Sequence, residues 1–143
     1  MDAERVAAYL HSLETDGSPF LCDLREYARE NDVPIVRRET ESFLRTMCTL
    51  VKPGNILEIG TAIAYSTIVF AEYCDDVTTI ENYEKRIALA KENIGQTGNE
   101  GRITLIEKDA GEALKNLVEN GRKFDLIFLD AAKGQYPVWL PDL

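Results

Sequence analysis

Four stretches of the sequence carry residues whose types and spacing could do chemistry. The first, Lys52–Tyr65, reads as a short apolar strand, a tight turn at Gly60 and the start of a helix. A turn of this kind brings backbone N–H groups and a helix N-terminus close to a ligand. Glu58 lies in the turn region, and its carboxylate would repel a phosphate but attract an ammonium or sulfonium cation. We therefore predict a cofactor that carries positive charge at this end.

Two of the other stretches offer carboxylates that follow predicted strands. Glu81 comes about twenty residues after Gly60, the usual distance for a carboxylate that accepts both ribose hydroxyls of a nucleotide cofactor. The alternative is a solvated charge at a strand end, and we favour the ribose role. Asp109 and Ala110 follow the third strand and could border an adenine ring. Asp109 could equally cap the following helix, and both roles are compatible.

The fourth stretch is Asp130-Ala131-Ala132-Lys133. An acid at the end of an apolar strand, followed within one turn by a lysine, indicates a candidate metal ligand beside a candidate base. The alternative is a surface ion pair, and spacing alone does not choose between the two.

The elements that must position these residues alternate between strand and helix. This alternation predicts a parallel sheet with right-handed crossovers, and such sheets bind ligands at the carboxyl ends of their strands. The segment 124–129 is apolar at nearly every position, so we expect it to be buried on both faces. The expected strands are 56–59, 77–80, 103–106 and 124–129, and the expected helices after the N-terminal region are 39–51, 66–73, 83–94 and 110–117.

The residues before the sheet read as helical. We expect two helices over 2–31, broken near 16–19, and then the helix 39–51 with Phe43, Leu44, Met47 and Leu50 on one side. His11, the only histidine, is expected to have a surface or packing role because no motif surrounds it. We therefore divide the chain into a helical cap, 1–51, and the first part of a cofactor-binding domain, 52–143.

Composition limits the functional classes. The chain has 143 residues, 45% of them hydrophobic, which suffices for a domain with a real core. Its net charge of -9 argues against broad nonspecific nucleic-acid binding, and no apolar run is long enough to span a membrane. Three cysteines lie far apart without a metal or redox motif, and a cytoplasmic location is expected.

With these motifs in place, the sequence resembles the class I S-adenosylmethionine-dependent O-methyltransferases of the catechol and caffeoyl-CoA type. The resemblance runs from about Val33 to the end and rests on VPIVRRET, ILEIGTAIAYS, Glu81, KDAGEAL and FDLIFLDAAKGQY. Within the family, IGTAIAYS and LDAAKGQY look most like the bacterial branch that methylates 5-hydroxyuridine in tRNA. The resemblance implies a Rossmann-like, doubly wound parallel sheet, S-adenosylmethionine and Mg²⁺ or another divalent cation as cofactors, and a homodimer.

The resemblance also implies roles for single residues. Lys133 would be the general base, Asp130 would ligate the metal ion and contact the cofactor, and Tyr136 and Trp139 could flank the acceptor, although core packing suits Trp139 equally. The acceptor would be tRNA or a small phenol. The remaining cofactor contacts would be Val36, Glu58, Gly60 and Ser66 at the methionine end, Glu81 at the ribose, and Asp109 and Ala110 at the adenine.

The sequence departs from the family pattern in two places. Ala64 stands where the loop usually carries glycine. The methyl group of alanine is tolerated there only if the backbone keeps a negative φ. The family also continues past Leu143 with three strands and an Asp-Asn pair that completes the metal site. We therefore expect a fragment that binds metal poorly, with an apolar fourth strand as an open edge.

Two functions of other classes compete with this interpretation. A nicotinamide-dependent dehydrogenase would share the strand order and Glu81, but Glu58 is badly placed for a pyrophosphate. A non-catalytic module for cofactor binding or oligomerisation is the second, and the expected missing strands favour it.

Overall fold

The fold is a parallel four-stranded sheet between helical layers. The computed structural model describes residues 2, 5–6, 8–9, 12 and 17–143, so His11 and most of the expected first helix lie outside the described residues. The strands lie in the order β3-β2-β1-β4, and every neighbouring pair is parallel. This confirms the predicted α/β fold. The strands are β1 (Ile56–Ile59), β2 (Val77–Glu81), β3 (Ile103–Glu107) and β4 (Leu126–Leu129).

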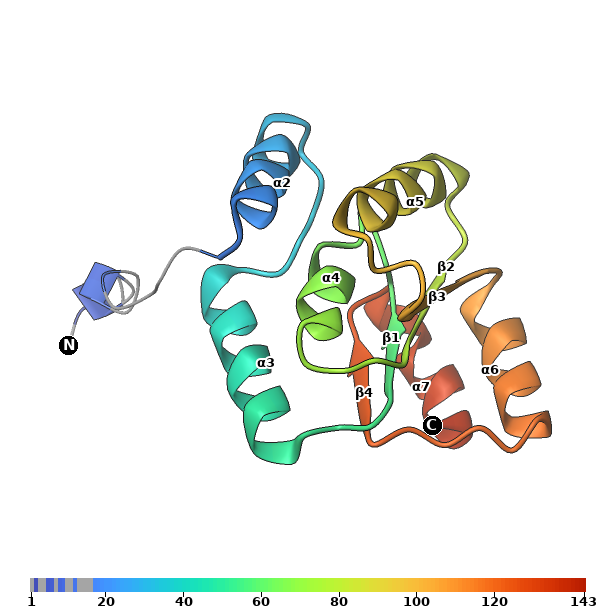
Figure 1. The fold of residues 1–143 in the computed structure, drawn as a ribbon. Coiled ribbons are helices and arrows are strands. Elements are labelled where there is room, and N and C mark those ends of the chain that lie inside the picture. Colours follow the sequence, from blue (N-terminus) through green and yellow to red (C-terminus); the bar gives the residue numbers. More distant parts are fainter. Residues whose placement is uncertain (1, 3–4, 7, 10–11, 13–16) are drawn as a thin grey trace.

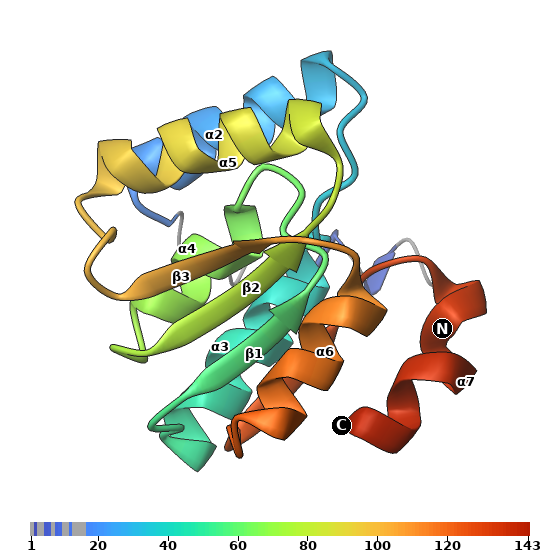
Figure 2. The same cartoon turned by 90° about the vertical axis from the view of Figure 1, so that its right-hand side faces the viewer.

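Helices cover both faces of the sheet (Figures 1 and 2). Helices α2 (Pro19–Glu30), α3 (Arg38–Val51), α4 (Tyr65–Ala71) and α5 (Glu84–Thr97) share one hydrophobic cluster with the sheet. Helices α6 (Ala110–Glu119) and α7 (Tyr136–Trp139) share a second cluster with the opposite face. Two 3-10 turns, Lys133–Gln135 and Leu140–Asp142, flank α7.

The alternation of side chains along β1 explains how one short strand serves both clusters. Ile56 belongs to the cluster of α2 to α5, whereas Leu57 and Ile59 belong to the cluster of α6 and α7. Successive strand residues point to opposite faces, so Glu58 shares the side of Ile56 and meets the hydroxyl groups of α4. All four residues of β1 are buried.

The helix boundaries follow local capping chemistry. Ser18 accepts a hydrogen bond from the backbone N–H of Leu21, and Pro19 occupies the first turn of α2. Asp109 caps α6 in the same way. The expected end of α5 is wrong: the helix runs through Gly95 to Thr97 and stops at Gly98, which adopts a left-handed φ of 68°.

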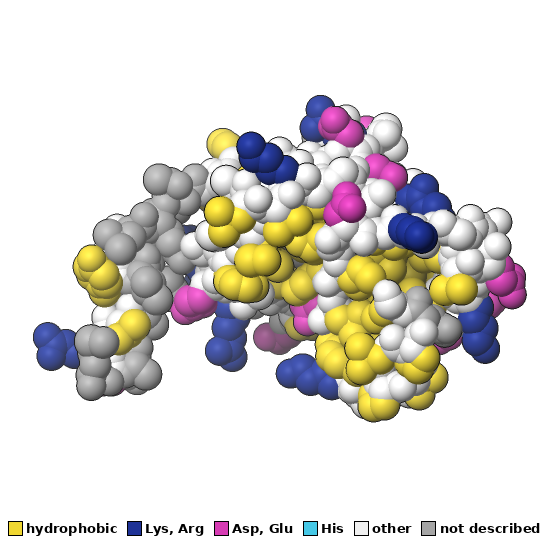
Figure 3. All heavy atoms as spheres, turned by 90° about the horizontal axis from the view of Figure 1, so that it is seen from below, with side chains coloured by type: hydrophobic (Ala, Val, Ile, Leu, Met, Phe, Trp, Pro, Cys, Tyr) yellow, Lys and Arg dark blue, Asp and Glu magenta, His cyan; other side chains and the backbone are white. Residues whose placement is uncertain are grey.

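The burial expected for β4 is wrong, whereas the expected open edge is confirmed. β4 pairs with β1 alone and lies at the end of the strand order, so its four residues are only partly buried. Helix α3 also differs from expectation, because Leu44 and Cys48 are buried while Phe43 and Leu50 are 62% and 73% exposed. Figure 3 shows hydrophobic side chains gathered on the face seen from below.

The membrane prediction can be checked over the described part of the chain. None of the helices there has both the length and the apolar character needed to cross a bilayer.

Candidate functional site

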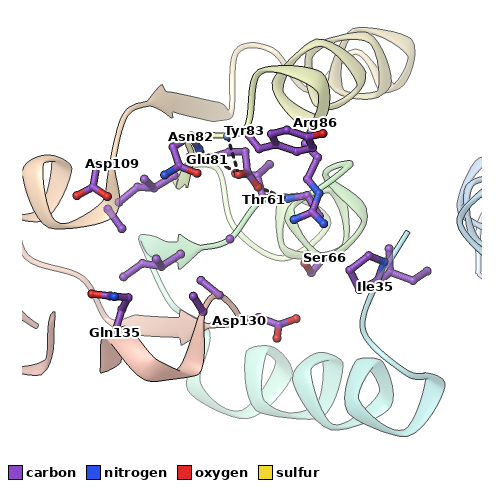
Figure 4. A pocket seen from close by; sticks show the side chains of 18 of the residues that line it. Ile35, Thr61, Ser66, Glu81, Asn82, Tyr83, Arg86, Asp109, Asp130 and Gln135 are labelled. Carbon is purple, nitrogen blue, oxygen red and sulfur yellow. Dashed lines mark hydrogen bonds between the residues drawn. The ribbon is translucent and has the colours of Figure 1, made fainter. Parts of the chain in front are cut away.

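A cavity of about 650 Å³ opens where the carboxyl ends of the strands meet. Figure 4 shows Glu81, Asp109 and Asp130, which follow or end three different strands, around the same hollow. This is the rim that the strand–helix alternation predicts. Of the candidate residues, the cavity is lined by Val36, Gly60, Ser66, Glu81, Asp109, Ala110 and Asp130.

Glu58 does not line the cavity, in contrast to the expectation that its carboxylate faces the cofactor. The residue is fully buried, and it accepts hydrogen bonds from Ser66 Oγ at 2.5 Å, from Thr79 Oγ1 at 2.7 Å and from Thr67 Oγ1. The reason is the alternation of β1, which turns this side chain towards α4 rather than into the loop. Glu58 therefore acts on the cavity through Ser66, which does line it.

The environment of Glu58 changes its acidity. Burial raises the pKa of this carboxyl to about 7, although the three hydroxyl groups of Ser66, Thr67 and Thr79 oppose the change, and the charge of Asp130 adds to it. When Glu58 is ionised it can only accept, so Ser66 must donate its single hydroxyl proton inwards. The lone pairs of Ser66 Oγ then remain for a donor in the cavity.

Gly60 is required by packing as well as by any ligand. Its φ is 104°, and a Cβ at this position would lie 2.2 Å from the carbonyl oxygen of Asp130. The segments at Gly60 and Asp130 come this close because Asp130 N donates to Ile59 O at 2.9 Å, which continues the pairing of β4 with β1. Only glycine fits this crossing.

Ala64 does not meet the condition under which a methyl group would be tolerated. It lies in the left-handed region with a φ of 67°, and Ala62 in the same loop has a φ of 48°. The turn nevertheless closes, because Ala64 N donates to Thr61 O at 2.8 Å. The loop therefore stores backbone strain of about 1–2 kcal/mol at Ala64.

Glu81 is held by the backbone rather than solvated. One carboxylate oxygen accepts from Ala62 N at 2.9 Å, and the other accepts from Asn82 N and Tyr83 N, both at 3.0 Å. The side chain is buried but lines the cavity. An ionised carboxylate offers about four acceptor positions, so Glu81 keeps one towards the hollow.

The residues after the third strand cap a helix and also line the cavity, whereas their contact with an adenine stays a prediction. Asp109 caps α6 by accepting from Gly111 N at 2.9 Å and Glu112 N at 3.3 Å, and it also lines the cavity beside the buried Ala110. Trp139 is both a cavity-lining residue and part of the core, at 6% exposure. Tyr136 does not line the cavity; its hydroxyl donates to Leu129 O at 3.0 Å and so fixes the end of β4.

Asp130 reaches the cavity but Lys133 does not. Asp130 is an exposed lining residue, and Ala131 and Ala132 after it also line the cavity, as does Gln135 at the end of the 3-10 turn Lys133–Gln135. Lys133 is exposed at the start of that turn. Lys133 follows the lining residue Ala132 directly, and its role as general base stays a prediction.

The side chains that the structure describes do not form a complete site for a divalent ion. Mg²⁺ takes about six oxygen ligands, and carboxylates supply its protein contacts. In the described part of the chain, no group of three or more His, Cys, Asp or Glu side chains could hold a metal ion, and Asp130 stands without such partners.

Several lining residues were missed by sequence reasoning. Tyr65, at the start of α4, faces the methionine side of the predicted site, and Tyr83 and Arg86 stand at the start of α5. Lys108 precedes the cap of α6. The usable signal is positional: residues in the first turn after each strand reach the rim of a parallel sheet.

Comparison with known proteins places this geometry in a family. A family model described as O-methyltransferase matches residues 11–142. The chain is similar to the catechol O-methyltransferase of Niastella koreensis, at 37% identity over 66% of this chain and 44% of that protein. It is also similar to the catechol O-methyltransferase of Mycobacterium tuberculosis, at 29% identity over 90% of this chain and 60% of that protein. The chain thus spans less than two thirds of these relatives.

Solved structures give the same result. The SAH-bound methyltransferase of Podospora anserina has a TM-score of 0.89 and 30% identity, covering 98% of this chain and 62% of that one. The O-methyltransferase of Bacillus cereus in complex with SAH has a TM-score of 0.84 and 28% identity, covering 96% and 66%. The family model covers most of the chain, and the chain belongs to the O-methyltransferase family.

Proposed function

We propose that this chain is the cofactor-binding part of an S-adenosylmethionine-dependent O-methyltransferase. The observation that carries the proposal is the cavity at the strand ends, where Glu81 is oriented by three backbone N–H groups. A carboxylate held in this way is preorganised to accept a hydrogen bond from a ribose hydroxyl. Asp109 and Ala110 lie on the same rim, where the adenine would follow the ribose.

The methionine end would lie at Gly60, Ser66 and Val36, which line the cavity. Because Ser66 donates its proton to Glu58, its oxygen would accept from the cofactor's ammonium group. This arrangement preserves the predicted preference for a cation, although Glu58 does not touch the ligand. It also disfavours a nicotinamide dinucleotide, because the backbone N–H groups of Gly60, Thr61 and Ala62 already donate within the protein, to Ile80 O and to Glu81, and are not free for a pyrophosphate.

The reaction would transfer a methyl group from the sulfonium to an acceptor oxygen. The S–CH₃ bond breaks as the O–CH₃ bond forms, S-adenosylhomocysteine leaves, and the acceptor hydroxyl gives its proton to a base, the role predicted for Lys133. The protein contributes chiefly by holding the two reactants in line. Trp139 and Gln135 line the side of the cavity beyond Asp130 and would border the acceptor. Lys133 is exposed beside the lining residue Ala132, and its role as general base stays a prediction.

We propose 5-hydroxyuridine in tRNA as the acceptor, on the resemblance of IGTAIAYS and LDAAKGQY to that branch. The exposed Arg37 beside the lining residue Val36 is a basic contact that a nucleic acid could use. A small catechol-type phenol is the second candidate, favoured by the names of the two bacterial relatives. A cytoplasmic homodimer is part of the same proposal, and the exposed Phe43 and Leu50 of α3 suit an interface.

Calorimetry tests the cofactor proposal. S-adenosylhomocysteine should bind and NAD should not, and Glu81→Gln should weaken binding about tenfold, because a hydrogen bond to a charged group is lost. Glu84→Gln is the matched control: Glu84 is an exposed acid three residues away that does not line the cavity. Binding of NAD alone, or equal affinities for both variants, would contradict the proposal.

A methyl-transfer assay distinguishes between the two candidate acceptors, tRNA and a catechol. The chain would be incubated with labelled S-adenosylmethionine and either catechol or tRNA that carries 5-hydroxyuridine, and labelled products would be counted. Transfer to tRNA supports the first candidate, and transfer to catechol supports the second. Cofactor binding without transfer to either supports the non-catalytic alternative.

A further inference from the structure

One guanidinium of α2 reaches the wall of the cavity, although no residue of α2 lines it. Arg25 Nη1 donates to the carbonyl oxygen of Val36 at 3.3 Å. Its Nη2 donates to Tyr65 Oη at 2.6 Å and to Glu41 Oε2 at 2.5 Å. Val36 and Tyr65 both line the cavity, from segments that are far apart in the sequence.

In the cluster formed by Arg25, Glu41, Tyr65 and the carbonyl of Val36, every hydrogen bond pairs a donor with an acceptor. Tyr65 has one hydroxyl proton and gives it to Glu41 Oε2 at 2.8 Å, so its oxygen is free to accept from Arg25. The Arg25 guanidinium also lies 4.6 Å from the centroid of the Tyr65 ring. The side chains of Arg25 and Glu41 are only 21% and 12% exposed, so water screens this ion pair less than a surface pair.

The charge states are also fixed near neutral pH. Burial alone would raise the pKa of Glu41, but hydrogen bonds from Arg45 and Tyr65 and two guanidinium charges lower it. Burial, with the neighbouring Glu41, raises the pKa of Tyr65 to about 12. The cluster therefore keeps one hydrogen-bonding pattern.

The cavity wall needs such a contact. Residues 32–37 form no regular helix or strand, so individual bonds hold this segment. Val33 N donates to Ala28 O at 2.9 Å at one end, and Glu41 N donates to Arg37 O at 2.9 Å at the other. The bond from Arg25 to Val36 lies between them, at the point where the segment faces the cavity.

We propose that Arg25 is a positioning residue for the cofactor cavity, because it ties the 34–36 wall to the Tyr65 wall and so sets the width of the methionine end. This inference rests on the proposed function. Its consequence is that a helix outside the cavity controls affinity for the cofactor without touching it.

Arg45 provides a matched control within the same cluster. Its Nε donates to the other oxygen of Glu41 at 2.9 Å, and it also contacts Glu72 and Tyr73. Its side chain is 24% exposed, close to the value for Arg25, and none of Arg45, Glu72 and Tyr73 lines the cavity. Loss of Arg45 should therefore cost stability without moving the wall.

The test compares Arg25→Met with Arg45→Met in the full chain. Both should lower the thermal midpoint, whereas only Arg25→Met should weaken S-adenosylhomocysteine binding, by about fivefold, the factor expected for one net hydrogen bond. Hydrogen exchange should also speed up at the amides of Ile35 and Val36 in Arg25→Met alone. Equal changes in affinity for the two variants, or unchanged exchange in Arg25→Met, would overturn the proposal.

Two further outcomes keep the inference separate from the proposed function. If the wild-type chain fails to bind S-adenosylhomocysteine, the proposed function fails, but the exchange comparison still decides whether Arg25 holds the wall. If Arg25→Met does not fold, Arg25→Lys replaces it, because a lysine keeps the charge beside Glu41 but lacks the planar fork that reaches three acceptors. Arg25→Lys should bind less tightly than Arg45→Lys; equal affinity would overturn the proposal.

Discussion

The buried carboxyl of Glu58 gives a sharp prediction about stability and pH. We consider Glu58→Gln, which keeps the shape of the side chain but removes the titration. In the native state Glu58 is fully buried, and burial raises its pKa from 4.5 to about 7. In the unfolded chain the group is solvated and its pKa returns to the ordinary value.

The direction of the effect follows from the protons bound. Below pH 4.5 both states are protonated, so Glu58 contributes its full stability there. Between pH 4.5 and 7 the native state holds one more proton than the unfolded state, so stability falls as pH rises. Each pKa unit corresponds to about 1.4 kcal/mol, so the loss is about 3 kcal/mol and is complete once the pH exceeds about 7.

Urea unfolding at several pH values between about 4.5 and 8 measures this term as the difference between the wild type and Glu58→Gln. The wild type should lose about 3 kcal/mol relative to the variant across this range. The amide of Glu58→Gln also changes the hydrogen bonds with the three hydroxyl groups, which shifts the free energy of unfolding by the same amount at every pH. The test uses only how the difference between wild type and variant changes with pH. Glu84→Gln should run parallel to the wild type. A difference between wild type and Glu58→Gln that stays constant across the range would refute the burial argument.

Three further variants test the loop and the core by urea unfolding. Gly60→Ala places a Cβ 2.2 Å from the Asp130 carbonyl oxygen and should lower the free energy of unfolding by more than about 2 kcal/mol; an unchanged midpoint would contradict the close approach. Ala64→Gly removes an alanine with left-handed backbone torsions and should raise the free energy of unfolding by up to about 1 kcal/mol. A decrease would contradict the strain. Trp139→Ala should cost about 3–5 kcal/mol, against less than about 0.5 kcal/mol for the exposed Val138→Ala; similar costs would contradict core packing.

The rim of the sheet could be predicted from sequence because parallel strands end on the same side. Glu81 ends one predicted strand and Asp109 follows another, so their meeting at one cavity needed no knowledge of long-range contacts. The same rule found Gly60, although the decisive reason for glycine there, the carbonyl of Asp130, comes from a distant part of the chain.

The orientation of Glu58 could have been inferred but was not. Alternation places it on the face of Ile56, towards the helix that follows the loop. Its partners Thr79 and Thr67 come from two other elements, and no local pattern identifies them. Backbone torsions such as the φ of Ala64 are likewise set by loop closure rather than by residue type.

The apolar pattern of α3 shows the limit of periodicity as a guide to burial. Phe43 and Leu50 are apolar and helically spaced, yet they are largely exposed. Periodicity identifies a hydrophobic face, but it does not identify what covers that face. Gln135 illustrates a second limit, because it lines the cavity from a 3-10 turn that the spacing after Asp130 did not indicate.

The residues that line the cavity are spread over most of the sequence, and this has a consequence during translation. Its wall begins at Pro34 and is complete only with Trp139, so a nascent polypeptide that has emerged as far as β3 lacks the whole β4 side. Ligand present in the cell therefore meets an open-sided cavity during the early stages of folding, and it gains the contacts on the β4 side only after those residues have left the ribosome.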